Sequence, residues 1–272
     1  MNASTAQLPV GVFASGVGGL TVARAIADRL PGEALLYLGD TARVPYGGKS
    51  PATVLHYTRQ ALGFFARRGV KLVVVACNTA SAAALPELGP RSPVPLVGVV
   101  EPGARAAAQR TNGAVGVIGT RTTIASGSYE TALQRLNPNL TIRTRPCPLF
   151  VPLAEEGWLS GPVPRWVAQS YLEPLKAAGV DTLVLGCTHY PLLKGVIAQV
   201  MGPGVELVDS AAETARAVAE LLENRGLLRP GGAKPEHRFF ATDVSDALTA
   251  LAGKFFGRPI EKLEPTELEG EL

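Results

Sequence analysis

The chain of 272 residues is poor in cysteine, histidine and aromatic residues, and each shortage removes a class of protein. Its three cysteines include no Cys-x-x-Cys pair, the usual motif of a redox dithiol. It has only three histidines, and two of them, His56 and His237, have no Cys or His at ligand spacing. A chain of this length buries enough surface to fold without a staple. We therefore expect no metal site and no disulfide framework.

Charge of one sign and long apolar runs are also missing. Charged residues make up 18% of the chain, the net charge is only +3, and Lys and Arg are scattered, which argues against nucleic-acid binding. No apolar stretch approaches the ~20 residues of a membrane span. The first ten residues lack the basic start and apolar core of a signal peptide. Free thiols suit a reducing compartment, so we expect a cytoplasmic protein that does not bind membranes.

The most informative feature present is a stretch that occurs twice. Residues 69–79 read GVKLVVVACNT, residues 179–189 read GVDTLVLGCTH, and Cys77 and Cys187 are 110 residues apart. A continuous Val/Leu run is typical of a strand buried on both faces of a parallel sheet. In such sheets the chemistry lies beyond the carboxyl ends of the strands. The repeat therefore predicts two strands that each deliver one thiol to equivalent places.

Two further pairs of similar segments occur at nearly the same spacing. Val115-Gly-Val-Ile-Gly-Thr120 matches Val10-Gly-Val-Phe-Ala-Ser15 at an offset of 105 residues, and Leu207-Val208 matches Leu96-Val97 at 111. We predict an α/β fold of two related lobes, each a mostly parallel sheet flanked by helices, with right-handed crossovers.

The boundaries of the lobes follow from where the repeat stops. The tail holds no third copy, so we predict that it completes the first lobe. The first lobe would then comprise residues 1–102 with 213–272, and the second would comprise residues 103–212. Within these ranges we expect a strand at 96–100, helices at 80–88, 103–110 and 210–228, and a last short strand near Ile260.

Several interpretations of the cysteine pair compete. Each thiol could be a small buried residue that ends a strand, since free Cys is often buried. A single Cys-His nucleophile would use Cys187 with His189 but would leave Cys77 idle. A third interpretation uses both, because stereoinversion needs one base and one acid on opposite faces of a carbon atom. A thiolate would remove the Cα proton while a thiol returned one to the far face.

Two turns fit an anionic substrate. Ser15-Gly-Val-Gly-Gly19 and Thr120-Arg-Thr-Thr123 each open a helix after a strand and offer backbone N–H and hydroxyl donors. Neither Gly-x-Gly-x-x-Gly nor Gly-x-x-x-x-Gly-Lys occurs, so a dinucleotide or nucleoside triphosphate is not indicated. A small dicarboxylate fits better, and donors on its carboxylate would stabilise the charge that develops at Cα.

These motifs together resemble the glutamate racemase family of the aspartate/glutamate racemase superfamily. The resemblance runs nearly from end to end and is carried by GVFASGVGGLTV, YLGDTARVPYGGKS, VVACNTASA, GVVEPGA, GVIGTRTTIASGSY, CPLFVPLAEEG and LVLGCTHYPLL. It implies two lobes related by a pseudo-twofold axis, with the active site between them. It also implies a cofactor-independent isomerase, usually a homodimer, that makes D-glutamate for peptidoglycan and so for the cell wall and cell shape. The substrate would be glutamate, with no nucleic-acid or membrane partner and no metal.

The resemblance also assigns roles by position. It implies that Cys77 acts on the D-glutamate face, that Cys187 acts on the L-glutamate face, and that His189 and Glu155 assist Cys187. Asp40 would have a supporting role. The implied substrate-binding set comprises Ala14, Ser15, Tyr46, Gly47, Asn78, Thr79, Thr120, Thr122, Thr188 and His189. Cys147 matches no catalytic position, and Trp158 and Trp166 suggest packing or a dimer interface.

One departure from the family pattern concerns the first motif. The family has Phe-Asp-Ser-Gly where this chain has Phe13-Ala14-Ser15-Gly16. The missing carboxylate is the one expected beside Cys77, so we predict an impaired racemase in which removal of the D-glutamate proton suffers most. Three alternatives stay open at this point: a racemase for another small acidic amino acid, a non-catalytic protein that binds glutamate or a partner, and a dithiol redox protein.

Overall fold

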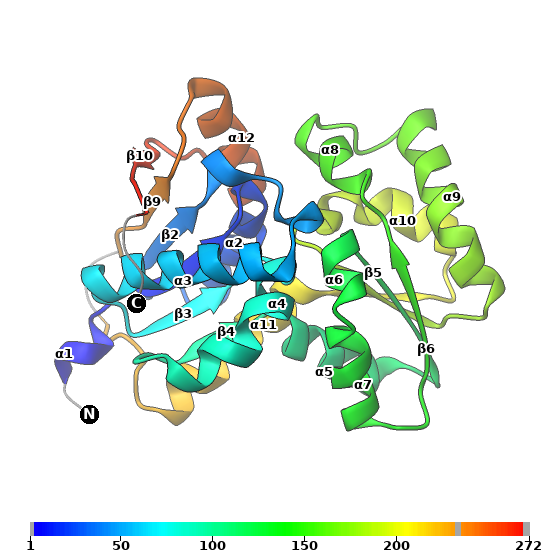
Figure 1. Cartoon of the computed structure of the whole chain (residues 1–272), viewed down its shortest axis with the longest axis horizontal. Coiled ribbons are helices and arrows are strands. Elements are labelled where there is room, and N and C mark those ends of the chain that lie inside the picture. Colours follow the sequence, from blue (N-terminus) through cyan, green and yellow to red (C-terminus); the bar gives the residue numbers. More distant parts are fainter. Residues whose placement is uncertain (1–2, 232–234, 269–272) are drawn as a thin grey trace.

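The structure, a computed structural model, describes residues 3–231 and 235–268. Its strands form two parallel sheets that lie in two lobes side by side (Figure 1). The first sheet has the order β10-β9-β2-β1-β3-β4 and the second has the order β6-β5-β7-β8. The strands of the first sheet are β1 (Val10–Ala14), β2 (Leu35–Gly39), β3 (Leu72–Val75), β4 (Leu96–Gly98), β9 (Arg238–Ala241) and β10 (Glu264–Pro265); those of the second are β5 (Ala114–Gly119), β6 (Thr141–Pro146), β7 (Thr182–Gly186) and β8 (Glu206–Asp209).

Helices flank both sheets, as the predicted fold class requires (Figure 1). They are α1 (Ala3–Ala6), α2 (Leu20–Arg29), α3 (Pro51–Arg68), α4 (Asn78–Leu88), α5 (Val100–Arg110), α6 (Arg121–Ala125), α7 (Ser128–Leu136), α8 (Phe150–Glu155), α9 (Pro162–Ala177), α10 (Lys194–Met201), α11 (Ser210–Asn224) and α12 (Asp246–Phe256). Short 3-10 turns occur at η1 (Val17–Gly19), η2 (Thr41–Arg43), η3 (Tyr46–Gly48), η4 (Gly89–Arg91) and η5 (Tyr190–Leu193). Within the described part of the chain, no helix combines the length and the apolarity that crossing a bilayer requires.

The strand order confirms the internal repeat. The run β2-β1-β3-β4 in the first sheet has the same order as β6-β5-β7-β8 in the second, so β3 and β7 occupy equivalent places. Gly69 and Gly179, which open the two cysteine stretches, both have φ of 72°, a conformation that favours glycine. The Gly-Val start of each repeat is therefore a helix-to-strand turn. Both strands that follow are fully buried, as their apolar runs predict.

The tail returns to the first sheet. Strand β9 pairs with β2 and strand β10 pairs with β9, both in parallel. This pairing supports a first lobe completed by the tail. The ranges 1–102 with 213–272 and 103–212 stay a prediction, because both junctions fall inside helices, α5 and α11, and α11 packs against α2 and α5. Residues 1–2, 232–234 and 269–272 lie outside the described part.

Some predicted boundaries were wrong, for local reasons. The strand expected at 96–100 ends at Gly98, and the following helix begins at Val100 rather than at 103, because Pro102 is tolerated in a first helical turn. The helix expected at 80–88 begins at Asn78. The strand expected near Ile260 lies at Glu264–Pro265, and Ile260 is buried in the core instead. Helix α11 ends at Asn224, before the predicted residue 228.

Candidate active site

Cys77 lies just beyond β3, where it precedes the first turn of α4. Parallel pairing places the end of β1 beside the end of β3, with Phe13 opposite Val75. Ser15 therefore reaches Cys77, and its Oγ lies 3.6 Å from the sulfur. Burial raises the pKa of the Cys77 thiol, and a negative charge on Cys187 would raise it further, whereas hydrogen bonds from Ala80 and Ser15 lower it. This thiol has hydrogen-bond donors around it but resists ionisation.

Cys187 lies at the equivalent place beyond β7 and has a different environment. Its sulfur is 3.7 Å from Nδ1 of His189, and Nε2 of His189 is 3.0 Å from Oε1 of Glu155 at the end of α8. Burial by itself lowers the pKa of His189, but hydrogen bonds to Cys187 and Glu155 outweigh burial and raise it from 6.5 to about 9. At neutral pH His189 is therefore an imidazolium that can stabilise a thiolate on Cys187.

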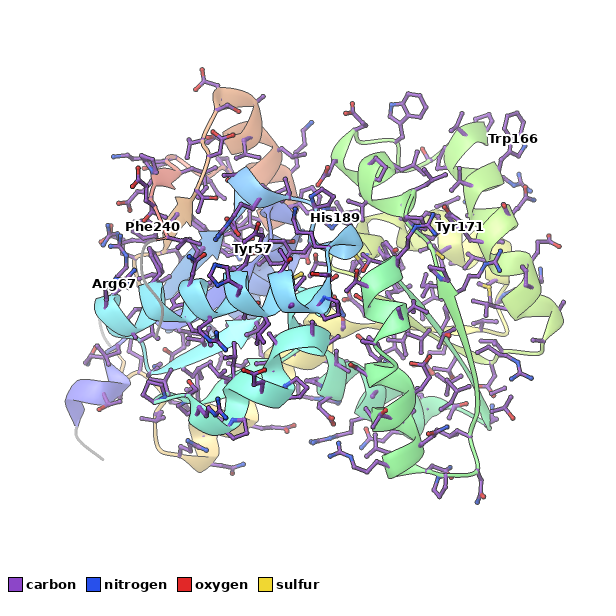
Figure 2. The ribbon with its side chains drawn as sticks, viewed as in Figure 1. Tyr57, Arg67, Trp166, Tyr171, His189 and Phe240 are labelled. Carbon is purple, nitrogen blue, oxygen red and sulfur yellow. The ribbon has the colours of Figure 1, made fainter. Side chains whose placement is uncertain are left out.

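The two lobes meet at these residues. Figure 2 shows His189 at the junction between the lobes. A side chain on Gly18 would collide with His189 and Thr188, so the glycine turn of the first lobe accommodates the second cysteine strand. Oγ1 of Thr21 donates to the carbonyl of Thr188 at 3.1 Å. Cys77 and Cys187 are 8% and 6% exposed, so both residues are largely shielded from solvent in this arrangement.

A second contact between the lobes comes from the loop after β2. Thr122 Oγ1 donates to the carbonyls of Gly47 and Lys49, at 3.0 and 3.1 Å. A side chain on Gly47 would lie 2.7 Å from the Cβ of Thr120, too close for any residue but glycine. The predicted residues Gly47, Thr120 and Thr122 are thus brought together.

Asp40 supports this loop rather than facing the thiols. Its fully buried carboxylate accepts hydrogen bonds from Tyr46 at 2.5 Å, from Nε of Arg43 at 2.7 Å and from Thr242 at 2.9 Å. The hydroxyl of Tyr46 is therefore already occupied, and its pKa is raised by burial and then by the neighbouring Asp40. The side chain of Tyr46 holds the loop in place and thereby fixes the position of Gly47, the next residue.

Two contributing residues were not predicted from the sequence. The hydroxyls of Thr79 and Thr120 lie 3.0 Å apart, and Thr123 lies within 3.1 Å of both, so three hydroxyls form one cluster. The spacing of Thr120 and Thr123, typical of an N-cap, was a signal for Thr123. Tyr129 accepts a hydrogen bond from Nδ2 of Asn78 at 2.8 Å, and nothing in its local sequence indicated this long-range contact.

The position of the absent family carboxylate is occupied by a buried methyl group. Ala14 ends β1, and its carbonyl accepts from the backbone N–H of Asp40 at 3.0 Å. Its side chain lies beneath the glycine turn, where any Cβ on Gly19 would collide with it. The neighbours that act on the Cys77 thiol are Ser15, Ala80 and Cys187, and none of the three supplies a carboxylate.

Two other features do not join this site. Cys147 is buried and its thiol lies 3.6 Å from the carbonyl of Arg145, which is not one of the predicted site residues. A cavity of about 1130 Å³ lies between α4, α5, α7 and α11, and none of the predicted site residues lines it. Among the described residues, no group of three or more His, Cys, Asp and Glu side chains is arranged to hold a metal ion. The polar groups predicted for the site converge near Cys77 and Cys187 instead.

Comparisons with known proteins identify the family of this chain. Residues 20–218 match the family model for Asp/Glu/Hydantoin racemase. The chain is 53% identical over 263 residues to the glutamate racemase of Geobacter metallireducens, covering 96% of this chain and 97% of the relative. The chain belongs to the glutamate racemase family.

The solved structures of this family share the fold. Glutamate racemase from Francisella tularensis in complex with D-glutamate aligns with a TM-score of 0.91 at 35% identity, over 97% of this chain and 99% of that one. Glutamate racemase from Thermus thermophilus in complex with β-chloro-D-alanine aligns with a TM-score of 0.88 at 48% identity, over 97% and 98% of the two chains. The predicted family and fold class are thereby confirmed, and the chain is an amino-acid racemase, an isomerase.

The hydrogen bond between His189 and Glu155 leads to a prediction for the pH dependence of this racemase. If an imidazolium at His189 supports Cys187, kcat/KM falls as pH rises through about 9, where His189 loses its proton. Glu155→Gln removes one of the groups that raise this pKa, so the fall moves to lower pH by roughly one unit. The neighbouring exposed residue gives a matched control, since Glu156→Gln leaves the profile unchanged. Identical pH profiles for Glu155→Gln and Glu156→Gln would contradict the role of Glu155 in raising the pKa of His189.

Proposed function

We propose that this enzyme interconverts L- and D-glutamate without a cofactor, using Cys77 and Cys187 as opposed acid and base. Starting from D-glutamate, a thiolate at Cys77 removes the Cα proton and becomes a thiol. The thiol of Cys187 then gives its proton to the opposite face and becomes a thiolate beside the His189 imidazolium. One proton leaves Cα and one returns, so the protein is left with one thiol and one thiolate. The reverse reaction exchanges the two roles.

The observation that carries this proposal is the equivalent position of the two thiols in the two lobes. Cys77 and Cys187 follow strands in equivalent places of two sheets with the same strand order, and a negative charge on Cys187 raises the pKa of Cys77. A relative from Francisella tularensis binds D-glutamate, which supports the same substrate here. The hydroxyls of Thr79, Thr120 and Thr123 offer donors for a carboxylate. We further propose that the product serves peptidoglycan synthesis in the cytoplasm, where thiols stay reduced.

A direct test supplies each glutamate enantiomer alone and follows the ratio by chiral chromatography. We expect both reactions to reach equal amounts of the two enantiomers, with aspartate neither converted nor competitive at similar concentration. Conversion of aspartate in preference to glutamate would favour a racemase for another small acid. Glutamate binding with no conversion of either enantiomer would favour a non-catalytic binding protein.

Alanine at residue 14, where the family has aspartate, is expected to slow the reaction without abolishing it. The buried Cys77 thiol lacks a carboxylate to accept its proton, and this makes proton removal from D-glutamate the slow step. The two enantiomers have equal free energies, so kcat/KM must fall by the same factor in both directions. The difference between the two proton transfers therefore appears in the kinetic isotope effects. We expect the primary isotope effect to be larger for the proton transfer at Cys77 than for the transfer at Cys187.

We also propose that the enzyme is a homodimer formed through the surface of α8 and α9. Four exposed apolar side chains gather there, Leu149, Trp158, Val163 and Trp166, and the two tryptophans are 53% and 67% exposed. Figure 2 shows Trp166 on the outer side of the second lobe, away from the first. Exposed aromatic residues at such density are typical of protein interfaces.

Replacing the tryptophans with charged residues should therefore change the oligomeric state. We expect the double variant Trp158→Asp, Trp166→Asp to sediment at half the mass of the unmodified enzyme, because it places charge in an apolar interface. Leu136→Asp, an exposed apolar residue on α7, serves as the control and leaves the mass unchanged. An unchanged mass for the double variant would remove this surface from the interface.

A further inference from the structure

The two hydrogen bonds of the His189 ring do not by themselves fix its orientation. Its Nδ1 is 3.7 Å from the sulfur of Cys187, a long contact, and its Nε2 bonds to Glu155, whose side chain is 42% exposed and open to competing water. The χ2 torsion of a histidine is broad, so the ring can turn about its bond to Cβ at little cost. Packing must therefore hold the ring between the thiol and the carboxylate.

The first lobe supplies that packing from two elements. Phe255, on α12, meets the His189 ring in a T-shaped arrangement, with centroids 5.3 Å apart and an interplanar angle of 76°. On η1, Gly18 approaches so closely that any Cβ on it would collide with Cε1 of His189. Phe255 is only 1% exposed, and side chains in a packed interior have little room to move aside. A ring of the second lobe is thus confined by residues of the first.

Helix α12 is itself anchored to the first lobe. It packs against α2 and η1, and its Phe256 packs against Phe239 of β9 with ring centroids 5.0 Å apart. Successive residues of an α-helix point about 100° apart, because the helix has 3.6 residues per turn. Phe256 can therefore contact the sheet while Phe255 contacts His189, and the sheet fixes where Phe255 stands.

The contribution of the first lobe to this ring is shape rather than charge. The charges that act on His189 are those of Cys187 and Glu155, both in the second lobe. Gly18 and Phe255 are uncharged, and the charged residues of α12, Asp246 and Lys254, are exposed. Replacing Phe255 with another apolar residue therefore changes the packing of the ring without adding or removing a charge.

We propose that Phe255 is a positioning residue that holds the His189 ring in the orientation that joins Cys187 to Glu155. The reactivity of Cys187 then depends on a residue from the opposite lobe. This rests on the proposed function, because it takes Cys187 as the group that exchanges protons with Cα on the L-glutamate face.

The other thiol does not share this dependence. Cys77 receives its hydrogen bonds from Ser15 and Ala80, which belong to its own lobe. Loss of the Phe255 ring should therefore slow proton transfer at Cys187 and spare proton transfer at Cys77. A general loss of packing would slow both.

Variants with one thiol allow the two proton transfers to be measured separately. In Cys77→Ala, exchange of the Cα proton of L-glutamate in D₂O reports on Cys187 alone. Adding Phe255→Leu should lower the maximal exchange rate about 10- to 100-fold, as expected for a displaced catalytic group, and leave the half-saturating concentration unchanged. Phe256→Leu removes the neighbouring buried ring of the same helix and should keep exchange within a few-fold. Equal losses for the two variants would overturn the proposal.

The opposite face provides the second arm of this experiment. In Cys187→Ala, exchange of the Cα proton of D-glutamate reports on Cys77, and Phe255→Leu should leave it unchanged. A comparable fall on this face would show that Phe255 supports the junction in general, and would overturn the proposal as well.

Titration of His189 by NMR tests the positioning role without any substrate. Burial lowers the pKa of this ring, and hydrogen bonds to Cys187 and Glu155 outweigh burial. A ring that loses its orientation loses those bonds, so in Phe255→Leu the pKa should fall from about 9 toward 6.5, whereas Phe256→Leu keeps it near 9. An unchanged titration in Phe255→Leu would contradict the positioning role. Absence of exchange in both single-thiol variants with Phe255 intact would instead reject the proposed function.

Discussion

Replacing Cys77 with alanine should abolish racemisation while L-glutamate continues to exchange its Cα proton with solvent. The remaining Cys187 keeps its own relay of His189 and Glu155, so it can still remove and return a proton on its own face. Without an acid on the far side, inversion should fall by at least the ~10²–10⁴-fold that a positioned acid–base group contributes. D-glutamate should show no exchange, since its proton faces the missing thiol.

The remaining cysteine supplies the control for that result. Cys147→Ala also removes a buried thiol, but this thiol donates to the carbonyl of Arg145 rather than to a predicted site residue, so the variant should keep racemisation within a few-fold of the unmodified rate. Cys187→Ala should give the mirror image of Cys77→Ala, with slow exchange confined to D-glutamate. Full racemisation by either single variant would show that one thiol suffices and would reject the opposed pair.

Restoring the family carboxylate should produce the second large effect. Ala14→Asp places an acceptor at the end of β1, next to Ser15 and therefore near the Cys77 thiol. We expect kcat/KM to rise ~10²–10⁴-fold, by the same factor in both directions. The restored carboxylate can accept the proton of the Cys77 thiol, and this speeds the slow proton transfer at Cys77. The primary isotope effect on that transfer should shrink as the step ceases to limit the rate.

A matched variant distinguishes the effect of a proton-accepting carboxylate from the effect of side-chain volume. Ala14→Asn has nearly the volume of aspartate but cannot accept the thiol proton, so its rate should stay near that of the unmodified enzyme. The Asp variant should also unfold more easily, since Ala14 is 1% exposed and burial of a carboxylate is unfavourable. Equal turnover by the Asp, Asn and Ala forms would contradict the role given to this position.

The internal repeat that ends in Cys77 and Cys187 allowed most of the architecture to be predicted from the sequence. Continuous apolar runs ending in Cys77 and Cys187 predicted buried parallel strands, and the matching offsets predicted two related lobes, whose sheets share a strand order in the structure. These signals are local and strong because a strand buried on both faces tolerates few residue types. Where burial is weaker the prediction was wrong, as for the short edge strand placed near Ile260.

The supporting contacts of the site were less accessible, because they join residues far apart in the chain. Nothing around Tyr129 reveals its bond to Asn78, and nothing around Thr242 reveals its bond to Asp40. The tail also brings Phe255 against His189, with ring centroids 5.3 Å apart. Such contacts depend on how the two lobes meet, which composition and periodicity do not encode. The sequence thus predicted the family and the buried strands better than the long-range contacts that join the two lobes.

The most direct test of opposed cysteine bases is the fate of the Cα hydrogen during the first turnovers in D₂O. Each enantiomer is supplied separately, and the substrate and product are separated and weighed by mass spectrometry at low conversion. We expect deuterium at Cα in essentially every product molecule and little in the remaining substrate, because the proton returned comes from the second, solvent-equilibrated thiol. Product that retains the substrate's own hydrogen would show that a single base carries the proton across, and would contradict the mechanism.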